Sequence, residues 1–283
     1  MTGQAALIAE APVATQTLSA LERGFKAGLS TVRSVIAYMF LSIAILVLWQ
    51  YLSDIGAIKP MLLPAPTKVA ATLMTMLING ELLSHLGISL LRVLEGFALA
   101  AVIGLPLGIG IGLSRALEHL TDLILQLMKP IPPIAWIPLS ILWFGIGEGG
   151  KVFIIFLGAV FPILINTVDG IRQTDQRFVE VARVLEVTRP RFILKVVLPG
   201  ALPAIMTGLR IGLMVAWICV VAAELIASSS GLGYLIMDAR QLMQTDRMLV
   251  GMLTIGVMGK FLDVALKAAE HRLITWKTSF AGH

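Results

Sequence analysis

The chain has 283 residues, of which 57% are hydrophobic and only 14% are charged. A soluble domain carries about 25% charged residues, and a chain this apolar cannot cover itself with polar surface, so an ordinary soluble globular protein is excluded. The net charge of +5 is better explained by basic residues beside membrane spans than by nucleic-acid binding. The single cysteine, Cys219, excludes a disulfide framework within one chain, and the scattered histidines lack metal-site spacing.

Residues 1–34 are mixed polar and small residues without a cleavable signal pattern, so we expect a cytoplasmic N-terminal segment there. Six apolar runs follow, each close to the length of about 20 residues that a helix needs to cross the hydrocarbon core. They are Val35–Tyr51, Ser89–Leu113, Leu120–Phe144, Val152–Val168, Ala201–Ile226 and Leu249–Ala268. The sequence predicts an all-α membrane protein with about six transmembrane helices in residues 35–275, followed by a cytoplasmic tail at residues 276–283.

The segment Pro64–Gly80 lies between the first two runs. Its apolar residues recur at helical spacing, at Val69, Leu73, Met76 and Leu77. We therefore expect a short external amphipathic helix that lies on the membrane surface.

Glycines recur every four residues in two of the runs. They are Gly104, Gly108 and Gly112 in one, and Gly208 and Gly212 in the other. Small residues at this spacing let helix backbones approach closely in lipid. The pattern favours packing between helices of the same chain over a dimer interface.

The third run is interrupted by prolines so closely spaced that no regular helix passes through it. They are Pro130, Pro132, Pro133 and Pro138. Non-helical backbone at membrane depth is tolerated only where protein buries it or where it lines a water-filled path. Lys129 gives a positive field for an anionic solute or snorkels to the interface, and Trp136 lines the path or belongs to the interfacial aromatic belt. The candidate translocation path here is Lys129, Pro132, Pro133 and Trp136.

The segment Gly145–Val152 fits the phosphate-loop pattern G-x-x-x-x-G-K, but it ends in Val152 where magnesium binding requires Ser or Thr. We interpret it as a glycine-rich turn between spans on the external side, where ATP is scarce. The sequence contains no other phosphate loop, so a process driven by ATP would need a partner that binds ATP and magnesium.

Basic residues are concentrated in the segments that face the cytoplasm if the N-terminus is inside. Those segments carry Arg23, Lys26, Arg33, Arg115, Arg172, Arg177, Arg183, Arg189, Arg191, Lys195, Lys267, Arg272 and Lys277. The external segments carry only Lys59, Lys68, Lys151, Arg240 and Arg247. We therefore expect both termini to be cytoplasmic.

Ionisable side chains inside spans cost about 2.5–3.5 kcal/mol on insertion scales, so each requires a partner or a wet path. Arg210 and Glu224 share the fifth run and face the same way, but they lie about 21 Å apart along the helix and cannot pair with each other. Each is a candidate for the translocation path or for structural pairing with another residue. Pairs spaced for contact on one helix are Arg92 with Glu95 and Lys260 with Asp263.

The long predicted cytoplasmic loop, residues 169–197, contains an apolar helical stripe among charged residues. The stripe consists of Phe178, Val181, Ala182 and Leu185. Such a stripe suits docking into a groove on a partner protein or lying on the membrane, and the pattern alone leaves both open.

The same loop contains Glu180-Val-Ala-Arg-Val-Leu-Glu186, nine further residues, and then Val196-Val-Leu-Pro199-Gly. This segment resembles the signature of ABC importer permease subunits, which reads E-A-A, three residues, G, nine residues, I-x-L-P. The spacing matches, while Val181, Glu186 and Val196 replace the first alanine, the glycine and the isoleucine. Because that glycine ordinarily allows a turn between two short helices, we expect Glu186 to make the elbow more helical.

Further segments resemble the permeases for taurine, aliphatic sulfonates, nitrate and bicarbonate. They are residues 129–139, 143–148, 198–210, 221–227 and 231–233. The resemblance covers residues 35–275 and implies a type I ABC importer permease fold in which two copies form the pore. It also implies two ATP-binding subunits docked on the cytoplasmic loops and a periplasmic or lipoprotein solute-binding protein. The residues predicted to couple to the ATPase are Phe178, Glu180, Val181, Ala182, Leu185, Glu186 and Pro199.

The predicted function is an inner-membrane permease subunit that moves a small sulfonate or related oxyanion such as taurine inward. It has no catalytic site, metal or cofactor of its own, and ATP and magnesium are held by the partner subunits. A nitrate- or bicarbonate-type permease is the alternative within the group. A secondary transporter would also use a broken helix, but no inverted repeat is evident. An intramembrane enzyme lacks support, since neither a histidine-rich motif nor a G-x-S-x-G elbow occurs.

Overall fold

The structure is a computed structural model that describes residues 40–274, apart from the side chains of Gln176 and Arg183. The described residues form two compact units, residues 40–68 and residues 69–274. The predicted cytoplasmic segments 1–34 and 276–283 and the beginning of the first predicted span lie outside the described residues. These predictions stay untested.

The N-terminal unit contains the apolar helix Phe40–Asp54. The Gln50 side chain, near the end of this helix, donates to the Asp54 carboxylate (2.9 Å) and accepts from the backbone N–H of Thr67 (3.3 Å). Helix α2, Pro66–Ile78, begins at that point. Gln50 therefore satisfies one of the unpaired N–H groups with which every helix begins.

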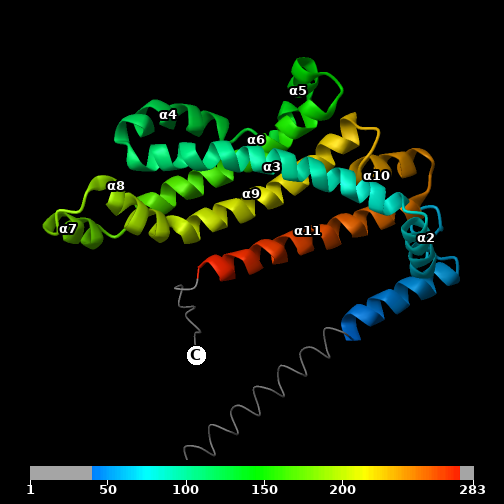
Figure 1. Ribbon diagram of the computed structural model, residues 1–283. Coiled ribbons are helices and arrows are strands. Elements are labelled where there is room, and N and C mark those ends of the chain that lie inside the picture. The colour runs from blue at the N-terminus through cyan, green and yellow to red at the C-terminus, as the bar shows by residue number, and fades with distance from the viewer. Residues whose placement is uncertain (1–39, 275–283) are drawn as a thin grey trace, which may run out of the picture. The chain divides into compact units, whose positions relative to one another are not determined.

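Three long helices form the centre of the second unit: α3 (Glu81–Leu113), α6 (Glu148–Arg172) and α9 (Leu198–Ala227) (Figure 1). Helix α6 lies in the middle and packs extensively against both α3 and α9. Fully buried residues at these contacts include Val93, Ile155, Ile163, Ala216 and Val220.

The glycine faces of α3 and α9 both pack on α6. A Cβ built on Gly108 would lie 2.8 Å from the Cβ of Thr167, and one built on Gly212 would lie 2.9 Å from a side-chain carbon of Ile163. Carbon atoms do not approach this closely, so these backbone contacts require glycine. The predicted packing of the glycine faces within one chain is confirmed.

Helices α10 (Leu232–Gln241) and α11 (Thr245–Leu273) complete the second unit. Helix α11 packs against both α9 and α10. At its contact with α9, Gly259 lies against the indole ring of Trp217, and the Trp217 Nε1 donates to the carbonyl of Ile255 (3.1 Å). This hydrogen bond satisfies the polar atom of a buried aromatic side chain.

Helix α2 is confirmed as a helix, but its surroundings differ from the prediction. Val69 and Met76 are buried, and Leu73 packs beside them against the main core. Thr72 donates to Asp246 at the start of α11 (2.7 Å). The expectation that this apolar face lies on the membrane surface is wrong for Val69, Leu73 and Met76, which protein covers, whereas Leu77 is 37% exposed.

Four helices of the described part of the chain are long and apolar enough to cross a membrane: Glu81–Leu113, Glu148–Arg172, Arg189–Ala227 and Thr245–Leu273. The third of these joins α8 (Arg189–Phe192), the π-helical turn η2 (Ile193–Val197) and α9. A fifth candidate is Arg115–Met128 together with Pro133–Phe144, a pair bent by 86°. The all-α prediction is confirmed, and these five match the second to sixth predicted spans.

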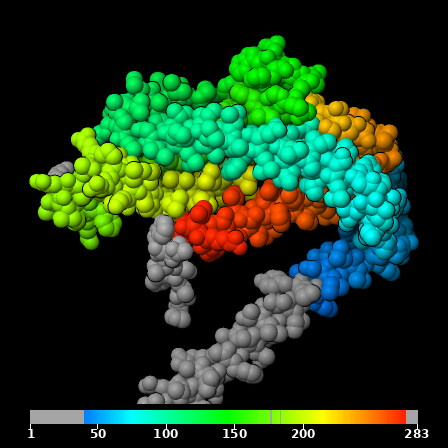
Figure 2. All heavy atoms as spheres, viewed as in Figure 1, coloured from blue at the N-terminus to red at the C-terminus, as the bar shows by residue number. Residues whose placement is uncertain are grey.

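The two ends of the bundle carry different helices. Helix α7 (Gln176–Val184) and α8 lie at one end of α6 and α9, whereas α10 lies at the other (Figure 1). Helix α4 (Arg115–Met128) lies along the bundle, and the α5 region (Ile137–Phe144) projects from its side (Figure 2). The loop that resembles the permease signature and the glycine-rich turn before α6 are therefore at opposite ends.

Candidate functional site

The predicted interruption of the third span is confirmed. Helix α4 ends at Met128, the 3₁₀ helix η1 (Pro133–Trp136) follows the break, and α5 begins at Ile137. Pro130 has no N–H with which to continue the helical ladder. Isolated turns hold the break instead: Ile131 donates to the carbonyl of Met128 (3.1 Å), and Ala135 donates to that of Pro132 (2.9 Å).

A cavity of about 370 Å³, which we call the groove, lies between this break and helices α6 and α9. Its lining residues are Lys129, Ile131, Pro133, Leu157, Gly158, Phe161, Pro162, Ile165, Asn166, Ile211 and Val215. Residues 157–166 lie near the middle of α6, and residues 211–215 lie near the middle of α9. The groove is therefore at mid-depth of the long helices, where broken helices of transporters hold their solutes and ions.

The polar groups of the groove are few. The Lys129 side chain is exposed and is the only charged group among the lining residues. The Asn166 side-chain amide donates to the carbonyl of Pro162 (2.8 Å), which leaves its own oxygen free to accept. Pro162 also offers no N–H to the Gly158 carbonyl one turn earlier. The groove thus combines one cationic donor and a few acceptors with a mainly apolar wall.

The residues predicted for the translocation path are not all in one place. Lys129 and Pro133 line the groove. Pro132 is exposed in the break but is not a lining residue, and Trp136 is half-buried and packs against the main core. Arg210 and Glu224 each lie in a separate ion pair, described next.

Arg210 pairs with α11. Its Nε lies 2.6 Å from the Asp263 carboxylate, and the Lys260 ammonium lies 3.7 Å from the second oxygen of Asp263. The predicted Lys260–Asp263 pair is therefore present. The contact of Arg210 supports structural pairing over path lining, because Asp263 neutralises its charge.

The three buried charged side chains of the described residues, Arg92, Lys151 and Glu224, meet the exposed carboxylate of Glu148 in what we call the charge cluster. Arg92 on α3 binds both carboxylate oxygens of Glu148 (2.6 and 2.7 Å) and one of Glu224 (2.7 Å). It also donates to the carbonyl and the hydroxyl of Ser230 (2.8 and 3.0 Å). All five guanidinium N–H groups are used.

The predicted pairing of Arg92 with Glu95 is wrong. The carboxylates that Arg92 binds come from α6 and α9, whereas Glu95 is exposed. Tertiary contacts have replaced a pairing within one helix, because the buried guanidinium needs partners on the inside of the bundle.

Glu224 is almost fully buried, at 1% exposure, and is held by the loop that leads into α10. Its carboxylate accepts from Ser89 (2.9 Å) and from the backbone N–H of Gly233 (2.9 Å). A Cβ on Gly231, which has a φ of +106°, would lie 2.2 Å from the Glu224 carboxylate. The loop can therefore close over this carboxylate only with glycine at position 231.

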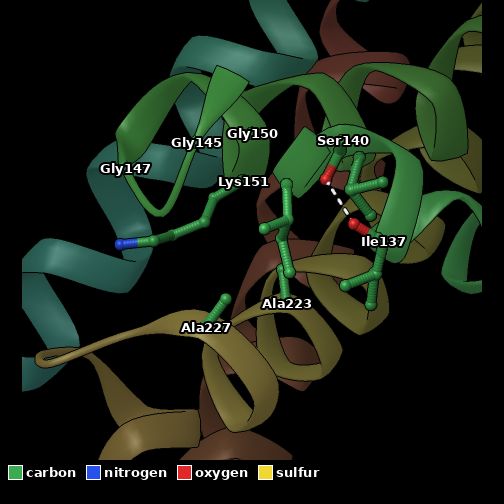
Figure 3. A pocket seen from close by; sticks show the side chains of 10 residues that line it. Ile137, Ser140, Gly145, Gly147, Gly150, Lys151, Ala223 and Ala227 are labelled. Carbon is green, nitrogen blue, oxygen red and sulfur yellow. Dashed lines mark hydrogen bonds between the residues drawn. The ribbon is translucent and has the colours of Figure 1, made fainter. Parts of the chain in front are cut away.

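Lys151, the lysine of the phosphate-loop-like segment, belongs to the charge cluster. Its ammonium donates to Glu148 (2.9 Å) and to the hydroxyl of Ser228 (3.2 Å). The segment forms a turn at residues 145–147 that leads into α6, as predicted. Figure 3 shows the cavity between this turn, α5 and α9, which at about 10 Å³ has room for about one water.

Helix α7 and Leu185, the residue that follows it, present most of the predicted apolar stripe to the outside. Phe178, Val181 and Leu185 are 58%, 55% and 68% exposed. Ala182 instead faces inward and lines a cavity of about 460 Å³ behind the helix, and Pro199 is half-buried at the start of α9.

The elbow after α7 is a turn. Helix α7 ends at Val184, and Glu186 has a left-handed φ of +52°. The N–H of Val187 donates to the carbonyl of Ala182 (2.9 Å), the bond of a helix C-terminus whose left-handed position is usually glycine. The expectation that Glu186 makes the elbow more helical is wrong, because the capping bond holds the turn even with a glutamate there.

A family model described as a binding-protein-dependent transport system inner membrane component matches residues 104–275, more than half of the chain. The chain belongs to this family. It is the permease subunit of an ABC importer, as predicted, and an inner-membrane protein.

Relatives of this permease cover most of its length. The putative aliphatic sulfonates transport permease protein SsuC of Bacillus subtilis is 43% identical over 244 residues, which are 86% of this chain and 88% of that protein. The taurine transport system permease protein TauC of Escherichia coli is 37% identical (82% and 86%). The bicarbonate transport system permease protein CmpB of Synechococcus elongatus is 38% identical (77% and 82%).

A solved structure of the inward-facing MetNI methionine ABC transporter matches the permease with a TM-score of 0.58 and 18% identity. The match covers 65% of this chain and 92% of that chain. At this identity the likeness concerns the fold, and it confirms the predicted type I permease fold.

Sequence reasoning did not bring the charge cluster together. Arg92 lies 56 residues from Glu148 and 132 residues from Glu224, so no local spacing connects them. The available signal was the cost of burial. An arginine and a glutamate in different spans are candidates to pair with each other, but the spacing of Arg92 and Glu95 favours a pairing within one helix instead.

Replacing Arg210 by glutamine should lower the thermal stability of the purified permease by a few degrees, because Asp263 loses its nearest cation. Assembly and uptake should be retained. Thermal unfolding in detergent and uptake on the same preparation measure this, with Lys260→Gln as the control for a more exposed neighbour of the same carboxylate. Unchanged stability together with poor uptake would return Arg210 to the translocation path.

Replacing Glu186 by glycine should stabilise the elbow, because a side chain in the left-handed region costs about 1–2 kcal/mol and the added flexibility of glycine offsets only about 0.5–1 kcal/mol. Glu186→Val should have the opposite effect. Limited proteolysis of the loop at residues 173–188 measures both. If Glu186→Gly loosens the loop or releases a bound ATPase, the carboxylate makes a specific contact there.

Proposed function

We propose that this permease forms half of the channel of an ATP-driven importer and that the groove beside Lys129 lies on the path of a small anion. The observation that carries the proposal is the broken helix itself. Its non-helical backbone lines a groove at mid-depth and exposes a lysine there. An exposed cation at this depth is costly unless it faces water or an anion.

The solute in this proposal is a small sulfonate or related oxyanion such as taurine. The relatives whose names state a solute include permeases for aliphatic sulfonates, taurine and bicarbonate, all of which carry an anionic group. A single lysine matches the single negative group that these solutes share. A nitrate- or bicarbonate-type solute is the alternative.

A second copy of the chain completes the path in this proposal. Lys129 of the groove is exposed, and α4, which ends at Met128 just before it, has an apolar face that is 61–72% exposed. The residues of that face are Leu120, Leu123, Ile124 and Leu127. A path for a charged solute has to be shielded from lipid all round, and a homodimer supplies the missing wall.

Two ATP-binding subunits dock on α7 in this proposal. The exposed side chains of Phe178, Val181 and Leu185 form an apolar face at the end of the bundle that the charge bias assigns to the cytoplasm. The partner subunits hold ATP and magnesium, and the permease needs no cofactor of its own. A periplasmic or lipoprotein solute-binding protein delivers the anion at the opposite end, and both termini are cytoplasmic.

The test is uptake by the assembled transporter with Lys129→Met. Uptake of the sulfonate should fall about tenfold or more, because the variant keeps the length of the side chain and removes its charge. Complex assembly should be intact. Lys260→Met, which removes an exposed lysine of α11 away from the groove, is the matched control. Equal uptake by the two variants and the native protein would identify Lys129 as a snorkelling residue.

A further inference from the structure

We propose that the groove is a solute-selecting site of the permease itself, shaped for an organic anion with an apolar tail rather than for a small inorganic oxyanion. The inference rests on the proposed function, since it assigns the solute class of the same path. Selection would then occur in the membrane as well as at the delivering protein.

The size of the groove is the first argument. Its volume of about 370 Å³ falls in the usual range of small-molecule sites, about 300–1,000 Å³. Nitrate or bicarbonate, with four heavy atoms, would occupy only the part next to Lys129. The remaining apolar wall would stay in contact with water.

The arrangement of the wall is the second argument. Leu157, Phe161 and Ile165 recur every four residues on α6 and form a stripe about 12 Å long. Ile211 and Val215 on α9 form a second stripe with the same spacing. A chain of several methylenes or an aromatic ring can lie between the two stripes while its anionic group reaches the lysine at the break.

The charge of the groove is the third argument. Lys129 is the single charged residue among those that line it, so a monoanion brings the site to neutrality. A dianion would leave one negative charge uncompensated at mid-depth of the membrane, which is unfavourable. The site therefore suits a monovalent head group, such as a sulfonate, on an apolar body.

Equilibrium dialysis of the full-length permease in lipid nanodiscs tests this. The probe is radiolabelled hexanesulfonate, displaced by methanesulfonate, butanesulfonate, nitrate, bicarbonate or uncharged hexanol, with empty nanodiscs as the reference for partition into lipid. Affinity should rise about fourfold for each added methylene that is buried. Nitrate, bicarbonate and hexanol should each displace the probe at least tenfold more weakly than hexanesulfonate does.

Two variants and one control variant locate the binding. Ile211→Trp should fill the groove and flatten the dependence on chain length, since Ile211 is partly exposed and a larger ring can be accommodated. Val257→Trp, at a more exposed position of α11 outside the groove, should leave it unchanged. Lys129→Met should weaken every anion about tenfold and leave hexanol unaffected.

Equal displacement by nitrate and hexanesulfonate would overturn the inference, as would the same chain-length dependence in empty nanodiscs or in Ile211→Trp. ATP-driven uptake by the assembled transporter is measured separately. Normal uptake without chain-length dependence of binding contradicts this inference and leaves the proposed function standing. Chain-length-dependent binding in the groove with no ATP-driven uptake supports the solute site and contradicts the proposed function.

Discussion

Replacing Arg92 by methionine should prevent the permease from accumulating as a stable protein. The variant leaves Glu224 almost fully buried with no cation, and breaking a buried ion pair in this way costs about 3–5 kcal/mol. The corresponding fall in unfolding temperature is about 10 °C or more. Membrane yield and thermal unfolding in detergent measure it.

Two further variants separate the ion pair from the bulk of the side chain. Glu95→Gln removes an exposed charge one turn away on the same helix and should behave like the native permease. The double variant Arg92→Met, Glu224→Leu leaves no buried carboxylate unpaired and should recover part of the lost stability. A double variant that is less stable than Arg92→Met would show that the ion pair is not the source of the effect.

Replacing Leu185 by aspartate should abolish ATP-driven uptake while leaving the membrane helices intact. The residue directly follows α7, continues its apolar face and is 68% exposed, so the change costs little in the permease alone. In a docked complex the same aspartate would be buried against an apolar groove without a partner, at a cost that removes binding. Co-purification of the ATP-binding subunit and uptake measure the two effects.

The control for this prediction is Leu242→Asp, which places the same charge at a 57% exposed leucine near the opposite end of the bundle. It should retain the ATP-binding subunit. Full co-purification with Leu185→Asp would assign the stripe to the membrane surface instead of to a partner.

The fold was largely predictable because the membrane constrains it so strongly. The lengths of the apolar runs predicted the long helices, and the proline break predicted the bent pair. The glycine spacing predicted the close packing that α3 and α9 make on α6. Pro64–Gly80 was predicted as a helix but assigned to the wrong surroundings. Its amphipathic pattern looks the same whether the apolar face meets lipid or protein, and only the tertiary contacts of Val69 and Met76 decide between them.

The site was only partly predictable. Lys129 and Pro133 were predictable as lining residues because the proline break, which is visible in the sequence, forms that wall of the groove. The walls from α6 and α9 come from apolar residues that look like ordinary span residues in sequence. At position 186, the change from the family glycine to glutamate predicts a more helical elbow. The backbone nevertheless keeps the left-handed turn with the glutamate side chain in place.

The most direct test of the account is transport by purified components in sealed vesicles. The permease, its ATP-binding subunits and its solute-binding protein are reconstituted, and uptake of a radiolabelled sulfonate is followed. We expect uptake only when all components and ATP are present, and none with Leu185→Asp. Uptake by the permease alone, driven by an ion gradient and indifferent to ATP, would contradict the account and identify a secondary transporter.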